Sequence, residues 1–514
     1  MVKVTNPVLT GFNPDPCLFK GKDAYYLLVS TFEYMPGIRV YESKDLANWN
    51  YKTAILTHID LSGNNRGCSI WAPFAAYHQG TYYVTYTDVK STRVPYKDVN
   101  NYIITAQSIE GPWSKPKYIN SSGFDPSIFF DDDNKCYFLN EYWDYRLHTH
   151  NKSAGILIQE LNPRTLTLID KPKILFKGTV AQKTEAPQIY KHNHYYYLLT
   201  AEGGTEANHM VTVARAKQIM GPYQIDPQNP MLTAKDNPNL TLQCAGHASL
   251  VKDKDDQWYM AHLATRPIKD DIALLGRETA IQNVYWSTDN WLRLSNNTNQ
   301  PNDTYEVHAK TSIKQQTHEF YDDFKTEQLN FAHWNTLRKM PTTDWLKFTP
   351  QGIQLAGGQS LQSEFDQHLI AKRQTDFNFK VSTVIQFNPV NYLQLAGLAL
   401  YLDIDNYLFF AITYDEKIGK SLTVMQAIAG DFKILISPIA ISEDSDIKLE
   451  IVVNNLDATL LFKDSEVMHT ILKDIDLSFL SGGFTGNFIA LDTIDMGQYN
   501  NAKACFKSFH YQPK

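Results

Sequence analysis

The first 290 residues repeat one short pattern of apolar and polar positions. Each copy begins with a polar or aromatic residue, usually followed by proline. A short apolar run, a polar turn and an aromatic pair that opens a second apolar run come next. The five copies begin at Asp15, Trp71, Asp125, Glu185 and His247. Each copy predicts a β-hairpin, because two apolar runs of strand length flank a short turn.

The spacing of the copies indicates how the hairpins assemble. They start roughly 60 residues apart, which leaves room for four strands and their loops in each repeat. A hairpin repeat of this length without helical periodicity predicts a five-bladed β-propeller over residues 1–300. The alternative is an irregular β-sandwich with chance similarity. The aligned aromatic pairs, such as Tyr25–Tyr26 and Tyr82–Tyr83, argue against it.

The second half of the chain has a different pattern. Polarity rises through 294–320, and we place a linker at 301–320. Alternating runs such as "FKVSTVIQF" (379–387) then predict a jelly-roll-like β-sandwich over 321–514. The predicted fold class is therefore all-β, a five-bladed β-propeller followed by a β-sandwich. If the sandwich closes one end of the propeller channel, only the end of a polymer chain can enter.

The innermost strands of a propeller line its channel, so the five leading residues are expected to face one another across the axis. Asp15, Asp125 and Glu185 would then share one small space, where like charges raise one another's pKa values. Such an arrangement costs stability and is usually functional. Within "GFNPDP" (11–16), Pro16 is expected to push Asp15 towards an extended backbone, and the two flanking prolines to hold it stiffly.

Three converging carboxylates suit two kinds of chemistry. With a histidine they can bind a hard cation such as Ca²⁺ or Mg²⁺. They can also hydrolyse a glycosidic bond, which needs a carboxylic acid to protonate the leaving oxygen and a carboxylate to activate water or attack. A third acid can orient the proton donor and keep its pKa high. We favour the hydrolase over a purely structural cation site.

The acid motifs resemble those of a known family. "GFNPDP", "GFDPSIFFDDD" and "KTEAPQIYK" look like the three acid motifs of glycoside hydrolase family 43, and "CSIWAPFAAYHQGTYYVTYT" (68–87) is similar to its β-xylosidase branch. The resemblance implies a five-bladed propeller with a C-terminal β-sandwich. It also implies an exo-acting, inverting enzyme that releases terminal xylose from β-1,4-xylo-oligosaccharides, with side α-L-arabinofuranosidase activity left open.

The resemblance also implies a role for each matched residue. Asp15 would be the general base, Glu185 the general acid, and Asp125 would orient Glu185 and modulate its pKa. The residues expected to contact the terminal sugar or lie beneath it are Phe32, Trp71, Trp143, His247, Arg277 and an aromatic side chain of "GGFTGNFIALDT", either Phe484 or Phe488. The resemblance assigns no metal ligands, although it leaves open a divalent cation such as Ca²⁺ near His247.

Composition and charge limit the partners. The formal net charge is −7 with no basic cluster, which argues against a nucleic acid or an anionic membrane. The N-terminal segment lacks the apolar stretch of a signal peptide. The five cysteines are widely spaced and form no CxxC motif, so we expect a cytoplasmic protein with reduced thiols. The expected partner is a xylo-oligosaccharide substrate. The resemblance implies a homo-oligomer, either a dimer or a tetramer.

Three other functions stay open on the sequence. An α-L-arabinofuranosidase or arabinan hydrolase would use the same acids in a pocket of different shape. A non-catalytic sugar-binding propeller would have no need of a proton donor. A retaining fructan hydrolase is also five-bladed, but its acid precedes cysteine, whereas Glu185 precedes Ala186 and Pro187.

Overall fold

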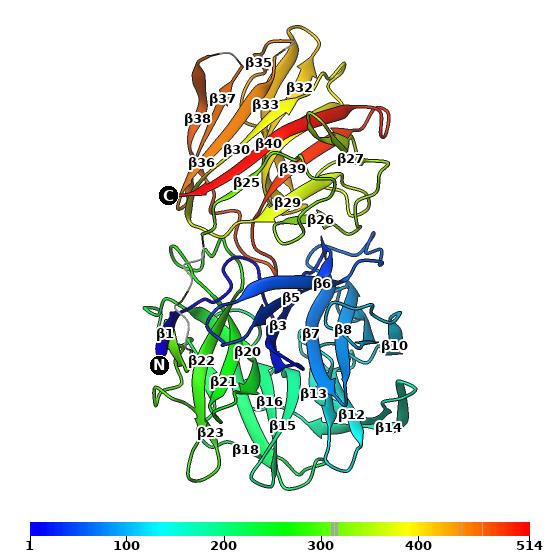
Figure 1. Ribbon diagram of the computed structural model, residues 1–514, viewed down its shortest axis with the longest axis vertical. Helices are drawn as coiled ribbons and strands as arrows, with labels where there is room; N and C mark the ends of the chain where they lie inside the picture. Colours follow the sequence, from blue (N-terminus) through cyan, green and yellow to red (C-terminus); the bar gives the residue numbers. More distant parts are fainter. Residues whose placement is uncertain (310–312, 314–316, 444, 465) are drawn as a thin grey trace.

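The chain folds into two all-β halves that lie one above the other along the long axis of the molecule (Figure 1). The structure is a computed structural model, and it describes residues 1–309, 313, 317–443, 445–464 and 466–514. Every regular element named within these ranges is a β-strand. In the same ranges, no helix is both long enough and apolar enough to span a membrane.

The blue-to-green half in Figure 1 contains five antiparallel sheets, the blades, whose strands come from successive parts of the chain. Blade one contains β2 (Cys17–Lys20), β3 (Tyr25–Val29), β5 (Gly37–Ser43) and β6 (Asn50–Leu56). Blade two contains β7 (Ser69–His78), β8 (Thr81–Ser91), β9 (Asp98–Ala106) and β10 (Lys117–Asn120), and blade three contains β11 (Ser127–Phe130), β12 (Cys136–Trp143), β13 (Ser153–Asn162) and β14 (Thr167–Phe176). Blade four contains β15 (Glu185–His192), β16 (Tyr195–Glu202), β17 (Met210–Ala216), β18 (Gln224–Ile225) and β19 (Leu232–Thr233), and blade five contains β20 (Gln243–Lys252), β21 (Trp258–Thr265), β22 (Glu278–Trp286) and β23 (Leu292–Leu294). The predicted five-bladed propeller is confirmed, and each predicted hairpin is the first strand pair of a blade.

The five leading residues are not equivalent, contrary to our expectation. The matching position at the start of each blade has a left-handed backbone, with φ between 39° and 54°, and its residues are Asp15, Ala72, Asp125, Ala186 and His247. Trp71 and Glu185 each lie one residue earlier than this position. The strand pairing shifts at this position in three blades: between Trp71 and Phe74, between Glu185 and Gln188, and between Gly246 and Ala248. Irregularities of this kind re-aim neighbouring side chains.

The backbone of Asp15 also differs from the expectation. Its φ is 54°, so the residue is left-handed and not extended. Aspartate tolerates this region better than most residues. The conformation persists because the surroundings fix both the backbone and the side chain: Ser30 N–H donates to Pro14 O at 3.1 Å, and the Ser30 hydroxyl donates to the carboxylate at 2.6 Å.

Neighbouring blades are joined near the axis by hydrogen bonds from buried hydroxyl groups. Between blades five and one, the Ser249 hydroxyl donates to Pro16 O at 2.8 Å and accepts from Leu18 N–H at 2.7 Å. Between blades two and three, the Thr85 hydroxyl donates to Pro126 O at 2.8 Å. These bonds fix the Asp-Pro segments that carry Asp15 and Asp125.

The yellow-to-red half is a sandwich of two sheets. In order across the first sheet lie β27 (Leu346–Thr349), β28 (Gly352–Ala356), β40 (Lys503–Pro513), β30 (Asn378–Gln386), β36 (Ile447–Asn454), β37 (Asp457–Lys463) and β38 (Met468–Asp476), and β25 (Phe320–Asp322) pairs with β40. In order across the second sheet lie β34 (Asp431–Ile434), β33 (Gly419–Ile428), β32 (Asn406–Asp415), β31 (Gln394–Asp403), β39 (Phe488–Asp495), β29 (Leu369–Arg373) and β26 (Trp334–Leu337), and β35 (Ile439–Ala440) pairs with β33. Buried side chains such as Leu398, Ile451 and Phe506 fill the space between the sheets, which confirms the predicted β-sandwich.

The second sheet of the sandwich continues into the propeller. Its outermost strand is β4 (Tyr34–Met35), a segment of blade one that pairs with β26. Two buried arginines add bonds across the boundary: Arg39 donates to Phe331 O at 2.8 Å, and Arg373 donates to Phe12 O at 2.8 Å. The sandwich is therefore fixed against one end of the propeller by backbone pairing as well as by side chains.

The connection between the halves contains structure of its own. The predicted linker, 301–320, includes β24 (Thr304–Val307), which pairs with β1 (Val2–Thr5) at the edge of blade five. Residues 310–312 and 314–316 of that segment lie outside the described residues. The division into 1–300, 301–320 and 321–514 stays a prediction.

The bonds of Ser249 predict how the ring of blades depends on them. Replacing Ser249 with alanine leaves Leu18 N–H and Pro16 C=O buried without their partner, at a cost of about 1–3 kcal/mol for each group. We expect Ser249→Ala to lower the thermal midpoint of the propeller by several degrees in calorimetry. The exposed Ser442 supplies the control, since Ser442→Ala should change stability by less than about 0.5 kcal/mol. Equal midpoints for the two variants would contradict the assignment.

Candidate active site

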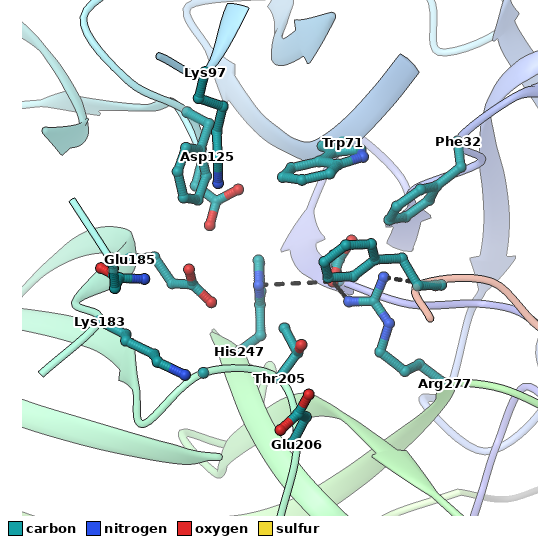
Figure 2. Close-up of a pocket in the computed structure, with 15 residues that line it drawn as sticks. Phe32, Trp71, Lys97, Asp125, Lys183, Glu185, Thr205, Glu206, His247 and Arg277 are labelled. Carbon is teal, nitrogen blue, oxygen red and sulfur yellow. Dashed lines mark hydrogen bonds and ion pairs between the residues drawn. The ribbon is translucent and has the colours of Figure 1, made fainter. Parts of the chain in front are cut away.

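A cavity of about 220 Å³ lies at the end of the propeller channel that the sandwich covers. Eight of the predicted site residues line it: Asp15, Phe32, Trp71, Asp125, Glu185, His247, Arg277 and Phe484. Figure 2 shows Asp125, Glu185 and His247 pointing into the same space, with Trp71 and Phe32 on another side of it. Four of the five blade-leading residues therefore contribute polar groups to one cavity, as the repeat predicts.

Asp15 is a buried carboxylate that neighbouring groups keep ionised. Arg277 Nη1 donates to Oδ1 at 2.8 Å, the Ser30 hydroxyl donates to Oδ2 at 2.6 Å, and His247 Nδ1 lies 3.7 Å from Oδ1. Burial raises the pKa of Asp15, but Arg277, His247 and Ser30 together outweigh burial and hold the pKa below its ordinary value. Asp15 thus carries a negative charge at neutral pH.

Asp125 and Glu185 differ from Asp15 because their pKa values are raised instead of lowered. Burial, together with the charges of Glu185, Asp15 and Glu141, raises the pKa of Asp125 well above its ordinary value. Burial also raises the pKa of Glu185 to about 7, although Lys97 opposes this shift. Asp125 Oδ2 accepts the N–H of Ala186, the residue after Glu185, at 3.1 Å. Asp125 therefore holds the backbone beside Glu185, and the charges of Asp15 and Glu185 in turn raise the pKa of Asp125.

Lys97 is the cation that faces these two acids. Its ammonium nitrogen lies 4.1 Å from the ring centroid of Phe124 and 4.3 Å from that of Trp143, and Figure 2 shows the side chain reaching down beside Asp125. Burial lowers the pKa of Lys97, and Glu141, Glu185 and Asp125 oppose this shift. Three basic side chains thus line the cavity: Arg277 at Asp15, Lys97 at Asp125 and Glu185, and Lys183, whose charge also acts on Glu185.

Aromatic rings form one wall of the cavity. Trp71 lies 5.6 Å from Phe32 and 5.4 Å from Phe484 between ring centroids, and Phe32 and Phe484 stack at 6.3 Å. The structure places Phe484 at the cavity and Phe488 in the core, where Phe488 stacks on Tyr34 and is fully buried. Such a wall suits the C–H face of a sugar ring.

The loop that brings Phe484 to the cavity packs directly on blade five. Gly276, with φ 70°, faces Gly486 so closely that an added Cβ would lie 2.6 Å from the Gly486 Cα. Arg277 Nη2 donates to Phe484 O at 2.9 Å, and Asn487 N–H donates to Leu274 O at 3.1 Å. The same arginine therefore contacts the carboxylate of blade one and the loop of the sandwich.

The structure does not bring Trp143 to the cavity wall, where we expected it. Its ring lies behind Lys97, and its indole N–H donates to Pro95 O at 2.9 Å. Sequence reasoning also missed the cavity-lining Lys97, Phe124, Lys183 and Glu206 and the buried Glu141. Of these residues, Glu141 lies nearest in the sequence to a predicted site residue, two positions before Trp143.

The surroundings of His247 do not fit a resident divalent cation. The carboxylate nearest to it, Asp15, is already paired with the Arg277 guanidinium, and burial lowers the pKa of His247. Among the described residues, no group of three or more metal-ligating side chains lies close enough together to hold a metal ion. A Ca²⁺ ion near His247 stays a prediction of the sequence alone, and we derive no step through it.

The cavity contains one carboxyl group that is ionised at neutral pH and another that is still protonated. Asp15 stays ionised at neutral pH and can accept a proton, whereas Glu185 still holds a proton near pH 7 and can donate one. General acid and general base catalysis at one site needs two titratable groups with different protonation states. The environments of such a pair move their pKa values apart.

The comparisons with known proteins agree with this chemistry. Residues 4–292 match the family model "Glycosyl hydrolases family 43", and residues 321–512 match "Beta xylosidase C-terminal Concanavalin A-like domain". The chain is 38% identical over 544 residues to a β-xylosidase of Bacillus subtilis (strain 168), with 100% of both chains covered. It is 36% identical over 534 residues to xylosidase/arabinosidase 43B of Humicola insolens, covering 100% of this chain and 98% of the relative. The crystal structure of xylan β-1,4-xylosidase from Bacillus halodurans C-125 superimposes with a TM-score of 0.96 at 39% identity, covering 99% of this chain and 100% of that one.

The raised pKa of Asp125 predicts a pH-dependent gain in stability on its removal. The native state binds this proton more tightly than the unfolded chain, so the wild-type protein loses stability as the pH rises above the ordinary value of 3.8. Asp125→Asn should therefore melt higher relative to wild type at pH 8 than at pH 5, by at least ~2 °C. The exposed Asp23 provides the matched control Asp23→Asn. The melting temperature of this variant should differ from that of the wild type by the same amount at pH 5 and pH 8.

Proposed function

Because the chain belongs to glycosyl hydrolases family 43, we propose that it is an exo-acting β-xylosidase that releases terminal xylose from β-1,4-xylo-oligosaccharides. One observation carries the proposal: an ionised Asp15 and a protonated Glu185 line the same buried cavity. Hydrolysis of a glycosidic bond needs one carboxyl group in each state.

We propose that the reaction proceeds with inversion. Glu185 gives its proton to the glycosidic oxygen as the bond from that oxygen to C1 breaks. Asp15 takes a proton from the water whose oxygen forms the new bond to C1 on the opposite face of the ring. Asp125 accepts the Ala186 N–H and so fixes the backbone beside Glu185. Burial and the charge of Asp15 raise the pKa of Glu185 and so favour its protonated form.

The size and closure of the cavity support exo action on a pentose. Its volume, about 220 Å³, is below the roughly 300–1,000 Å³ typical of pockets for drug-sized ligands. Phe484 of the sandwich forms part of the wall, so the sandwich helps to bound the cavity. A single terminal xylosyl unit matches this space, with Trp71 and Phe32 against its C–H face and Arg277 donating to its hydroxyls.

The second candidate activity is α-L-arabinofuranosidase, since one relative is named a xylosidase/arabinosidase. Both activities would use the same acids and differ only in how the pocket fits a pyranose or a furanose ring. The ratio of rates on p-nitrophenyl β-xyloside and α-arabinofuranoside separates the two. A non-catalytic sugar-binding protein would have no use for a carboxyl group that keeps its proton near pH 7.

We also propose that the protein acts in the cytoplasm on imported xylo-oligosaccharides and forms a homo-oligomer, either a dimer or a tetramer. Five unpaired cysteines support a reducing compartment. Exposed aromatic side chains, including Tyr96 and Tyr145 with ring centroids 5.3 Å apart, support contact with a second copy of the chain.

Substitution of the two acids tests the proposed roles. Glu185→Gln should lower kcat on xylobiose by ~10²–10⁴-fold, because the leaving sugar needs a proton, but should slow a dinitrophenyl xyloside much less. Asp15→Asn should slow both substrates alike, because both need activated water. The exposed Glu327 gives the matched control Glu327→Gln, which should retain full activity. Wild-type turnover of xylobiose by the Glu185 variant would refute the assignment.

The stereochemistry of the product tests inversion separately. An inverting enzyme needs its two carboxyl groups roughly 6.5–9.5 Å apart to leave room for water, whereas ~5 Å favours retention. We expect proton NMR of a β-xyloside digest to show the α-anomer of xylose first, before mutarotation. If the β-anomer comes first, Asp15 is a nucleophile and the proposed base role is wrong.

A further inference from the structure

The position of Glu185 in the cavity depends on its neighbours along the chain. Within the described residues, no hydrogen bond or ion pair holds its carboxyl group. On one side of it, Asp125 Oδ2 accepts the N–H of Ala186 at 3.1 Å. On the other side, the Ser153 hydroxyl donates to Thr184 O at 3.1 Å. The groups that fix Thr184 therefore help to decide where the carboxyl group of Glu185 lies.

A buried acid outside the cavity holds the Thr184 side chain. Glu202 is the last residue of β16, which pairs with the strand that carries Glu185, and its side chain is completely buried. Glu202 Oε1 accepts the Thr184 hydroxyl at 2.9 Å and the Thr179 N–H at 2.8 Å, and Oε2 accepts the Thr179 hydroxyl. Three donors thus converge on one carboxyl group, and a carboxylate is the side chain that can accept at both oxygens.

The segment that these bonds anchor, 178–184, has an unfavourable backbone. Gln182 and Lys183 directly precede Thr184, and both are left-handed, with φ of 61° and 54°. Residues other than glycine keep this conformation only where the surrounding structure fixes it. The Gly203 N–H donates to Gln182 O at 2.9 Å, and the two threonine contacts of Glu202 hold the segment near both of its ends. Without the Glu202 contacts, the segment is free to relax and to move the backbone of Glu185 with it.

The chain closes tightly over the contact between Thr184 and Glu202. Gly178 has φ of 86°, and an added Cβ there would lie 1.9 Å from Thr184 Oγ1 and 3.1 Å from Glu202 Oε1. Only glycine fits at this point, so the local sequence suits the contact. The same segment brings a second group to the cavity, since Lys183 lines it, and Figure 2 shows Lys183 and Glu185 on the same side.

We propose that Glu202 is a positioning residue of the reaction: its hydrogen bonds to Thr179 and Thr184 fix the segment before β15 and so hold Glu185 where it can protonate the leaving oxygen. The proposal rests on the proposed function, because it assumes that Glu185 is the acid. Glu202 does not line the cavity and acts through the backbone that precedes Glu185. Proton transfer requires hydrogen-bond distance, and a displacement of about 1 Å can cost roughly 100-fold in rate.

The test compares two aryl xylosides with leaving groups of similar shape. Phenoxide is a poor leaving group that needs the proton of the acid, whereas dinitrophenoxide leaves without it. Leucine has nearly the shape of glutamate but accepts no hydrogen bond. We expect Glu202→Leu to lower kcat/KM on phenyl β-xyloside by at least ~10-fold and on dinitrophenyl β-xyloside by less than ~2-fold. An equal loss on both substrates, or no loss on either, overturns the proposal.

Two milder variants test the hydrogen bonds themselves. Glu202→Gln keeps one acceptor oxygen for the Thr179 N–H and the Thr184 hydroxyl, so it should retain about half or more of the wild-type kcat/KM on phenyl β-xyloside. Thr184→Val removes one bond and should lower this value about threefold, with dinitrophenyl β-xyloside unaffected. In the Glu202→Leu background, Thr184→Val should cause less than half of that loss on a logarithmic scale. A full additional loss means that the two residues act independently and refutes the proposal.

A second buried acid of blade four separates positioning from stability. Asp226 follows the outermost strand of the blade, where it is buried, pairs with Arg293 and accepts the Gln228 N–H at 2.9 Å. Asp226→Asn should lower the melting temperature but leave the ratio of the two rates at its wild-type value. If Asp226→Asn changes the ratio as much as Glu202→Leu does, the ratio reports stability and the proposal is wrong.

The Glu185→Gln variant distinguishes this inference from the proposed function. It should slow phenyl β-xyloside far more than dinitrophenyl β-xyloside, and equal slowing of both would refute the acid role of Glu185 itself. If Glu185→Gln shows the difference and the Glu202 and Thr184 variants do not, only the positioning role fails. Where Glu202→Leu does not fold, the ratio measured for Thr184→Val decides the question, and a wild-type ratio overturns the proposal.

Discussion

Four carboxyl groups removed from water at one end of the propeller channel are the constraint on which the rest of this structure depends. Asp15, Asp125, Glu141 and Glu185 are balanced within the cluster chiefly by two cations, Arg277 and Lys97. In a medium of low polarity, four negative charges cannot all persist against two positive ones. The imbalance leaves the acid beside Arg277 ionised and the acids beside Lys97 with raised pKa values, so one cavity holds carboxyl groups in both protonation states.

The fold supplies the positions that this imbalance requires. Asp15 and Asp125 precede the inner strands of their blades, whereas Glu185 is re-aimed by a β-bulge at Ala186 and Pro187. The sandwich completes the site from outside the propeller, because its loop brings Phe484 to the cavity and accepts a hydrogen bond from Arg277. Excluding water at this point strengthens each charge interaction in the cavity.

The repeat in the sequence located much of this site. Asp15, Asp125 and His247 lie at matching left-handed positions because the hairpins that follow them are locally encoded by apolar runs and turns. The alignment was wrong by one residue at Trp71 and Glu185, because the left-handed position in these two blades is the alanine that follows, Ala72 or Ala186, and alanine adds no polar signal to the pattern. Lys97 was missed because it lies between strands, in a segment with no repeated motif, and Trp143 was assigned a wall position that Lys97 and Phe124 occupy.

The sequence by itself determined the all-β class, the five hairpins, the sandwich and the identity of the three acids, because period-two patterns and Asp-Pro turns are local properties of the chain. Tertiary structure alone decided which cation faces which acid, and which of Phe484 and Phe488 reaches the cavity. It also decided that Glu141 belongs to the cluster. Protonation depends on the distance between charges and on their burial, and both are fixed only when residues far apart in the sequence pack around one axis.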